Sequence, residues 1–197
     1  MIYDAETDLY YDDRRHAYID GETGAVLPSV TQIVGILEPT KYAGIDSEVL
    51  ARAAAYGNKI HRIAELMADG DEAEAYAMIN TPEELHAAEA ARRLLKDNIH
   101  GIVLSERMIR NGNKYAGRYD LLTNNGALLI DIKTTSKLDR NALYWQLGLY
   151  AACFEVRPKT AVLWLPKRGK PVFEYMDAAT PEEVEALVLR YEINIAE

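Results

Sequence analysis

Two aspartates near the middle of the chain have the types and spacing of a metal-dependent hydrolytic site. Asp120 and Asp131 lie in short apolar runs on either side of an Asn-Asn-Gly turn. If Asn125 and Gly126 form a two-residue hairpin loop, counting outward places Asp120 directly opposite Asp131. Opposed side chains have Cβ atoms about 4.5–5.5 Å apart, and like charges there are destabilising. A divalent cation between the two carboxylates would offset that repulsion.

Lys133 adds a third functional group to this pair. It follows Asp131 by two residues, so the period of a strand brings both side chains to the same face. Mg²⁺ or Mn²⁺ held by Asp120, Asp131 and the backbone carbonyl of Ile132 would neutralise a phosphodiester and lower the pKa of bound water. Lys133 would then orient the attacking water and stabilise charge on the phosphorane. The alternative is a surface ion pair between Asp131 and Lys133.

The charge of the chain is unevenly distributed. The 197 residues contain 22 Lys and Arg against 31 Asp and Glu, a net charge of −9. Residues 101–170 reverse this balance, with 12 basic against 5 acidic residues. A locally basic segment suits a polyanionic partner, because local fields govern binding more than total charge does. The alternative is a chance mixture of solvated faces, and the acidic remainder argues against indiscriminate coating of DNA.

Length and composition suit a single domain over residues 1–197, with residues 1–45 as an N-terminal extension of hairpin strands and a short helix. The acidic N-terminus has no apolar run, so we expect no signal peptide. No window has the length and apolarity of a transmembrane helix, so no membrane contact is expected. A single cysteine, Cys153, excludes an intrachain disulfide, and a reducing cytoplasm is the expected compartment.

Helix boundaries are predicted mainly from capping residues. Ser29-x-x-Gln32 and Thr81-Pro82-Glu83-Glu84 are capping boxes, and Asp46 and Asp139 are suitable N-cap residues. The predicted helices cover residues 29–37, 46–69 with Gly70 as the stop, a short piece within 71–80, 81–98, 139–155, and a C-terminal helix after Thr180.

Strands are predicted from alternating or continuous apolar runs between turn residues. They cover small hairpin strands within residues 8–27, residues 101–110, 114–122, the run that ends in Asp131-Ile132-Lys133, 160–165 and 171–176. The order of helix, three strands, helix and strand predicts an α/β domain with a central mixed sheet flanked by helices.

Glu106 lies in the strand predicted over residues 101–110. Its phase with Ile102, Leu104 and Met108 directs it inward, and a buried carboxylate requires a partner. It is either a supporting acid of the site, close enough for a second metal, or the ion-pair partner of Arg118 on the neighbouring strand.

The motifs together resemble the PD-(D/E)XK nuclease superfamily, and in particular its RecB-like branch. They are Gly117-x-x-Asp120, Asp131-Ile132-Lys133-Thr134 and Gln146-x-x-x-Tyr150, with Gly57-x-x-x-His61 and Pro28-Ser29-Val30-Thr31 upstream. That branch includes phage recombination exonucleases, the nuclease domain of RecB and mitochondrial genome-maintenance exonucleases. Tyr119 stands where the superfamily name has proline. The resemblance runs from about residue 28 to residue 165.

The resemblance implies a restriction-endonuclease-like core and gives each motif residue a role. Asp120 and Asp131 would be metal ligands, Lys133 the catalytic lysine and His61 the ligand supplied by a helix. Glu65, four residues after His61, would accept the second ring N–H and fix the tautomer. Without the resemblance, a single histidine on a helix is more often a packing or surface residue.

Further residues are predicted to contact the substrate. Gln146 and Tyr150 are one helical turn apart and share a face, which the resemblance places beside the site; their alternative role is helix surface and core edge. Basic side chains near the site are candidate phosphate contacts, and each could equally be a solvated charge. They are Arg118, Lys137, Arg140, Lys167, Arg168 and Lys170.

The expected function is therefore a Mg²⁺- or Mn²⁺-dependent DNA nuclease, a phage or prophage exonuclease acting on DNA ends in recombination or repair. The resemblance implies a single-strand annealing protein as a partner and homo-oligomers as a possible state. Two alternatives remain open at this point. One is a catalytically inactive nucleic-acid-binding module of the same fold, and the other is a structure-specific endonuclease.

Overall fold

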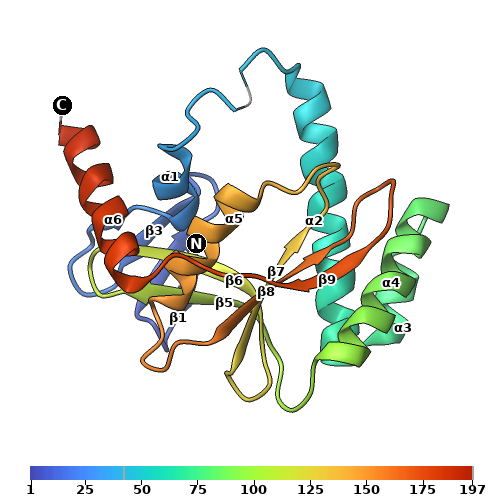
Figure 1. Ribbon diagram of the computed structural model, residues 1–197. Helices are drawn as coiled ribbons and strands as arrows, with labels where there is room; N and C mark the ends of the chain where they lie inside the picture. The colour runs from blue at the N-terminus through green and yellow to red at the C-terminus, as the bar shows by residue number, and fades with distance from the viewer. Residues whose placement is uncertain (42, 197) are drawn as a thin grey trace.

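Two β-sheets organise the chain (Figure 1), and the computed structural model describes residues 1–41 and 43–196. The larger sheet has the order β5-β6-β7-β8-β9, and only its β7–β8 pair is parallel. Its strands are β5 (Leu104–Asn111), β6 (Tyr115–Thr123), β7 (Leu128–Lys133), β8 (Lys159–Trp164) and β9 (Val172–Tyr175). The predicted mixed α/β architecture is therefore confirmed at this level.

The smaller sheet is antiparallel and formed by the N-terminal segment. Its strands, in spatial order, are β1 (Ile2–Asp4), β2 (Leu9–Asp12), β3 (Ala17–Asp20) and β4 (Val26–Leu27). Leu9, Tyr11 and Leu27 pack against Met108 and Ala116 of the larger sheet. The N-terminal hairpin strands were predicted, whereas β1 was not.

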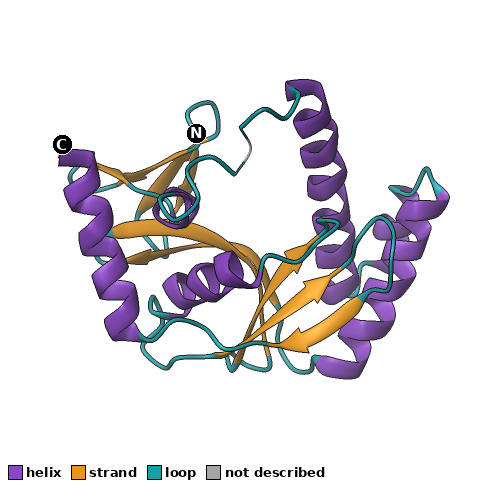
Figure 2. Ribbon diagram, turned by 45° about the horizontal axis from the view of Figure 1, so that its top comes forward, coloured by secondary structure: helices purple, strands orange, loops and turns teal. Residues whose placement is uncertain are grey.

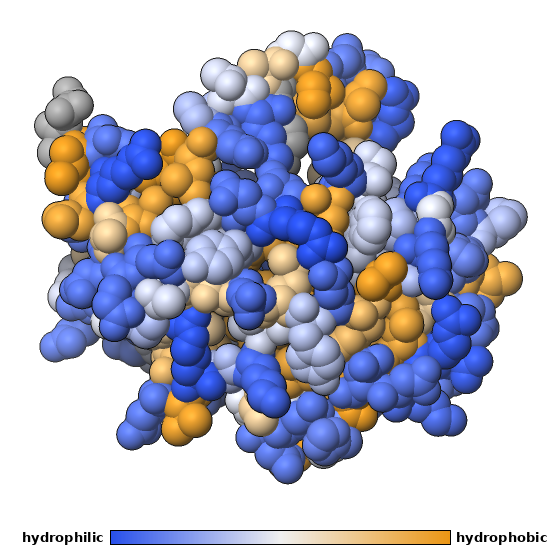
Figure 3. Space-filling model, in the orientation of Figure 1, coloured by the Kyte–Doolittle hydropathy of each residue, from blue (hydrophilic) through white to orange (hydrophobic). Residues whose placement is uncertain are grey.

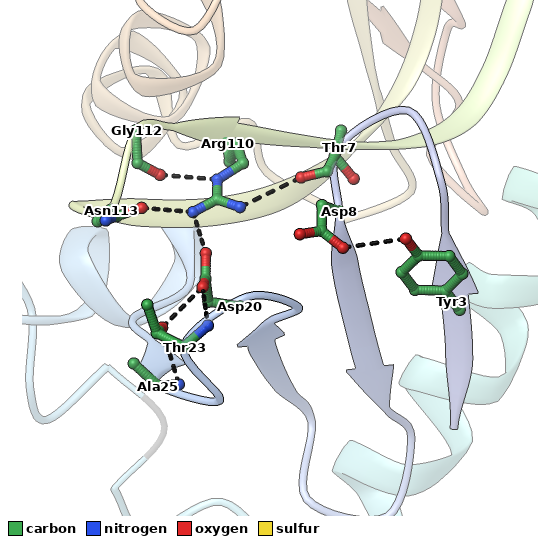
Figure 4. A network of polar contacts seen from close by, with 9 residues as sticks. All are labelled: Tyr3, Thr7, Asp8, Asp20, Thr23, Ala25, Arg110, Gly112 and Asn113. Carbon is green, nitrogen blue, oxygen red and sulfur yellow. Dashed lines mark hydrogen bonds and ion pairs between the residues drawn. The ribbon is translucent and has the colours of Figure 1, made fainter.

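Arg110 of β5 links the two sheets through polar contacts (Figure 4). Its guanidinium donates to the backbone carbonyl of Thr7 at 3.2 Å and forms an ion pair with the buried Asp20. Hydrogen bonds from the Thr23 hydroxyl and N–H, with the Arg110 charge, lower the pKa of Asp20 to about 2. Hydrogen bonds from Thr23 and the charge of Arg110 thus compensate the burial of the Asp20 carboxylate.

The helices form where the capping residues predict them. Ser29 and Gln32 make both bonds of a capping box, as do Thr81 and Glu84. The helices are α1 (Val30–Gly35), α2 (Ser47–Asp69), α3 (Glu72–Ala77), α4 (Pro82–Asn98), α5 (Arg140–Ala151) and α6 (Pro181–Ala196).

Helix α5 ends at Ala151, four residues before the predicted end at Glu155. The backbone N–H of Cys153 bonds to Tyr150 at 3.0 Å and that of Phe154 to Ala151 at 3.4 Å. Bonds to the third preceding residue tighten the last turn, which terminates the α-helix.

Helices cover both faces of the larger sheet (Figure 2). On one face α2, α3 and α4 pack against alternate strand residues, including Leu121, Ile130 and Ile132. On the other face α1, α5 and α6 enclose a second core with Leu122 and Leu129. The period of a strand separates these two sets, because successive side chains point to opposite faces. The predicted inward direction of Ile130 and Ile132 is confirmed.

The hairpin of β6 and β7 has the predicted register. Leu121 pairs with Ile130 and Thr123 with Leu128, which directs Asp120 towards Asp131 one step beyond the ladder. The predicted facing pair of Asn124 and Ala127 is kept by one hydrogen bond, since the Ala127 N–H donates to the Asn124 carbonyl at 3.3 Å. The ladder itself ends at Thr123 and Leu128, and the Asn124 N–H donates to the carbonyl of His100 after α4. Asn125 and Gly126 still occupy the turn with positive φ angles of 58° and 87°.

The surface is polar over most of the face shown in Figure 3, with apolar side chains gathered near the C-terminal end of α6 at the upper left. Leu189, Ile193 and Ile195 are the exposed apolar residues of that helix end. Within residues 1–41 and 43–196, no helix combines the length and apolar composition needed to cross a bilayer.

Gly117 provides a test of the packing beside the hairpin. A Cβ at this position would lie 2.7 Å from Tyr150 Cε1 and 3.0 Å from Val30 Cγ2. We expect Gly117→Ala to lower the free energy of unfolding by about 1–3 kcal/mol, because two buried side chains must shift.

Urea-induced unfolding measures this effect, with Gly35→Ala as the control. Gly35 lies in α1, and no atom lies within 4 Å of the place that a methyl group would take there, so alanine should be neutral or stabilising. Equal unfolding midpoints for the two variants would contradict the packing argument.

Candidate functional site

The carboxylate of Asp120 joins three elements that lie far apart in the sequence. Its Oδ2 accepts the backbone N–H of Ile132 at 2.5 Å, and its Oδ1 lies 3.4 Å from His61 Nδ1. Asp120 belongs to β6, Ile132 to β7 and His61 to α2. The structure therefore brings His61 together with the hairpin, as the sequence motifs predicted.

Asp131 and Lys133 form an ion pair beside this contact. Lys133 Nζ lies 2.6 Å from Asp131 Oδ2, and Asp131 is only 4% exposed. Among the described residues this buried oxygen has no aligned hydrogen bond. The alternative of a surface ion pair does not hold for Asp131, since the carboxylate is buried.

Burial and mutual repulsion divide the acids of the site into two kinds. Burial raises the pKa of Asp131; the Lys133 charge opposes this effect and the Asp120 charge adds to it, and the net shift is upward. Burial also acts on Asp120, but the His61 charge and hydrogen bond outweigh it and lower the pKa of Asp120. The same contact raises the pKa of His61 despite its burial. The shifts of His61 and Asp120 thus both favour the charged forms of that pair, whereas the shift of Asp131 favours its neutral form.

The predicted metal ligands are close but engaged with each other. Among the described residues, no three His, Cys, Asp or Glu side chains are arranged to hold a metal ion. The side chains are instead paired with one another, His61 with Asp120 and Asp131 with Lys133. The donor set itself fits Mg²⁺ or Mn²⁺, since it is rich in carboxylate oxygen and includes a buried Asp131 oxygen without an aligned hydrogen bond.

Ile132 contacts the site through its backbone N–H, which the sequence did not predict. Its N–H donates to Asp120, and its side chain is fully buried in the core. Ligation by its backbone carbonyl stays a prediction.

Glu65 does not take the predicted role of orienting the imidazole. The ring nitrogen of His61 that is paired, Nδ1, faces Asp120, and no hydrogen bond among the described residues joins Glu65 to the ring. Glu65 lies 3.5 Å from Arg62 and hydrogen-bonds to Glu106. A bond between two carboxyl groups requires a proton. Burial, followed by repulsion from Glu106 and Asp120, raises the pKa of Glu65 to about 7.

Glu106 forms the ion pair with Arg118 that was one of its two predicted roles, and its role as a supporting acid of the site stays a prediction. Its Oε2 lies 2.7 Å from Arg118 Nε, and it is also the hydrogen-bond partner of Glu65. The prediction that Ile102 and Leu104 point inward with Glu106 is wrong, because their side chains are 68% and 37% exposed. The backbone of Glu106 has a φ of 51°, so simple alternation does not continue through this residue.

Tyr150 and Gln146 share the predicted face of α5 but differ in exposure. Tyr150 is 6% exposed and packs close to Gly117 and Val30 in the core. Burial raises the pKa of Tyr150 far above its ordinary value. Gln146 instead lines a cavity, so of this pair only Gln146 faces space that a ligand could enter.

That cavity has a volume of about 830 Å³ and adjoins Lys133. It lies between α1, the segment after it, the end of β7 and the start of α5. Apolar side chains such as Val34, Leu37 and Leu143 form part of the wall. Its charged and polar lining consists of Glu38, Lys41, Lys133, Thr135, Lys137, Asp139, Asn141 and Gln146.

Lys41 was missed from the sequence. It forms ion pairs with Glu38 at 3.1 Å and with Asp139, the N-cap residue of α5. The second contact joins residues that are 98 positions apart. No local pattern marks such a pair.

The predicted phosphate contacts differ in their availability. Both terminal nitrogens of Arg140 bond to Glu174, at 2.7 and 2.8 Å. Arg118 is paired with Glu106 and lies 5.4 Å from the centre of the Tyr11 ring. Lys137 lines the cavity, and its contact with a phosphate stays a prediction.

Comparison with known proteins gives no family. The chain matches no family model and no curated protein. One similar solved structure is described as "Crystal structure of SSO0001". The likeness covers 84% of this chain and 75% of that one, at 16% identity and a TM-score of 0.42.

The raised pKa of Glu65 predicts how stability depends on pH. A carboxyl group that binds its proton more tightly when folded stabilises the fold below its unfolded pKa, about 4.3, and loses this contribution as pH rises through about 7. We expect Glu65→Gln to be more stable than the unmodified protein by about 1–3 kcal/mol at pH 8.5 but not at about pH 4.

Urea unfolding at the two pH values tests this expectation. Glu22→Gln, at an exposed turn position, is the matched control and should track the unmodified protein at both. A stability difference for Glu65→Gln that does not change with pH would refute the assignment.

Proposed function

We propose that the protein is a divalent-metal-dependent deoxyribonuclease that hydrolyses phosphodiester bonds. The observation that carries this proposal is the convergence of His61, Asp120, Asp131 and Lys133. They come from α2, β6 and β7 and meet at the carboxyl end of β7. These are the residue types that phosphodiester hydrolysis requires, and the 830 Å³ cavity beside Lys133 gives a ligand access.

The arrangement of elements supports a PD-(D/E)XK core for the same domain. Helix α2 precedes the meander of β5, β6 and β7, and α5 connects β7 to the parallel strand β8. This is the order of helix, three strands, helix and strand that the sequence resemblance implies. The resemblance, and not the order alone, assigns the nuclease chemistry.

Each site residue has a defined part in the proposed reaction. Asp120 and Asp131, with His61, would hold Mg²⁺ or Mn²⁺, which when bound supplies charge neutralisation and an acidified water. Lys133 would exchange its contact with Asp131 for the attacking water and the phosphorane oxygens. The Ile132 N–H fixes the orientation of Asp120 while this occurs. Gln146 would contact the substrate from the cavity wall.

A non-catalytic nucleic-acid-binding module is the second candidate. The observation that favours it is the set of internal ion pairs, since His61 and Lys133 are each bound to a site aspartate. Such pairing would hold the fold without any chemistry. Cleavage assays separate the two candidates.

Asp120→Asn and Lys133→Ala test the catalytic assignment. Each should lower the rate of DNA cleavage in Mg²⁺ or Mn²⁺ by about 100-fold or more, because a metal ligand or a transition-state cation is lost. End-labelled DNA incubated with each variant measures the rate, and circular dichroism checks that the fold persists.

Arg93→Ala, at an exposed position of α4, is the control for loss of a charge. Cleavage that survives both site substitutions would refute the mechanism. Binding of DNA by the unmodified protein without hydrolysis at any metal concentration would favour the non-catalytic candidate.

Cleavage of linear DNA compared with covalently closed circular DNA distinguishes an exonuclease from an endonuclease. An exonuclease acting on DNA ends should degrade linear duplex or single strands and leave covalently closed circles intact. Gel analysis of both substrates in one tube measures this, and nicking of the circle would favour a structure-specific endonuclease. A role in recombination or repair, with an annealing protein or further copies of the chain as partners, rests on the resemblance alone.

A further inference from the structure

The parallel pair of β7 and β8 places a second loop beside the site. Lys133, at the end of β7, is in register with Trp164, at the end of β8. The backbone N–H of Leu165 donates to the carbonyl of Lys133 at 2.7 Å, which extends this alignment by one residue. The chain that leaves β8 therefore emerges at the same edge of the sheet as Lys133. Ligands of sheets with parallel strands commonly bind at this carboxyl edge.

The chain that follows β8 is a short basic loop of residues 166–171. Lys167, Arg168 and Lys170 are all exposed, and Gly169 makes the turn between them with a φ of 118°. No ion pair among the described residues involves Arg168 or Lys170. Two unneutralised cations at the edge that carries Lys133 are a local positive field.

Lys167 fixes the position of this loop against α2. Its Nζ lies 5.1 Å from the centre of the Tyr56 ring, and Tyr56 precedes Gly57 and His61 on the same helix. Figure 1 shows the loop between β8 and β9 next to α2. The loop thus lies on the α2 side of Lys133.

The cavity provides basic groups on the other side. Lys137 lines it with Gln146 of α5, which packs on the opposite face of the sheet from α2. Lys41 lines it too, but its charge is already paired with Glu38 and Asp139. The indole N–H of Trp164 donates to the carbonyl of Thr135 at 2.7 Å, so the segment between β7 and α5 is attached to the end of β8. Cations therefore flank Lys133 from both directions.

We infer that the loop of residues 166–171 is a phosphate-binding element that holds the backbone of a nucleic-acid strand as it crosses the site. This inference rests on the proposed function, and it adds that the substrate is a strand of several nucleotides rather than a single phosphodiester. A strand that passes from the cavity over Lys133 to the loop presents phosphates to cations on both sides of the reacting one. The contacts are to the backbone, so they position the strand without reading its sequence.

The double variant Arg168→Ala/Lys170→Ala tests this inference through binding. Fluorescence anisotropy with a labelled single strand of about 20 nucleotides, in Ca²⁺ and at several salt concentrations, gives Kd and its salt dependence. We expect Kd to rise by about 10-fold, and the slope of log K against log salt to fall by about 1.4 for two lost phosphate contacts. Arg14→Ala/Arg15→Ala, which removes two exposed charges from the turn between β2 and β3, should change neither quantity.

A small substrate separates the loop from the chemical step. Turnover of bis(4-nitrophenyl) phosphate in Mn²⁺ requires the site but cannot span the loop, so the double variant should match the unmodified protein. Unchanged Kd and slope in the double variant, with DNA cleavage by the unmodified protein, would overturn the loop inference alone. An unmodified protein that neither binds nor cleaves DNA would overturn both the inference and the proposed function.

Discussion

A mostly buried carboxylate, Asp120, connects helix α2 to the β6–β7 hairpin. Removing such a charge from water is costly unless hydrogen bonds and an opposite charge compensate it. The N–H of Ile132, in β7, supplies the hydrogen bond, and His61, in α2, supplies the opposite charge. A shift of α2 away from the hairpin would remove the His61 contact and leave Asp120 with the Ile132 N–H but without its partner from the helix. The requirement to satisfy one carboxylate is therefore also what assembles the candidate site.

The four acids near this point cannot all be ionised at low cost. Asp120 keeps a lowered pKa because His61 faces it, whereas the pKa values of Asp131, Glu65 and Glu106 are raised by burial and by their neighbours. Protons, Lys133 and Arg118 thus supply the positive charge that the cluster needs. A bound divalent cation would supply the same charge, which links metal binding to loss of protons at these groups. This coupling is a property of the cluster and not of any single residue.

Features set by neighbouring residues were predictable from the sequence, and those set by distant ones were not. Asn125-Gly126 determined the hairpin register, and Asp46 and Gly70 determined both ends of α2, because these signals act within a few residues. The hydrogen bonds between Asn124 and His100 join this turn to the segment that follows a different helix, and no local signal predicts them. The positive φ of Glu106 likewise depends on its surroundings in the folded chain. For the site, the aspartates and Lys133 could be predicted from spacing, whereas the contact of Lys41 with Asp139 has no local signal.

The glycines of the Gly57-x-x-x-His61 and Gly117-x-x-Asp120 motifs leave room for close packing and take no part in the chemistry. Gly117 leaves room for the Tyr150 ring, which would otherwise meet a Cβ at 2.7 Å, and so lets α5 pack onto β6 next to Asp120. A Cβ at Gly57 would lie 3.2 Å from Thr134 Oγ1. A small residue at position 57 therefore lets α2 approach the end of β7 closely enough for His61 to reach Asp120. Each glycine precedes its functional residue by three or four positions and lies on an element that must approach another one closely. The spacing of both motifs therefore reflects the same physical demand, that a polar group be buried between backbones in near contact.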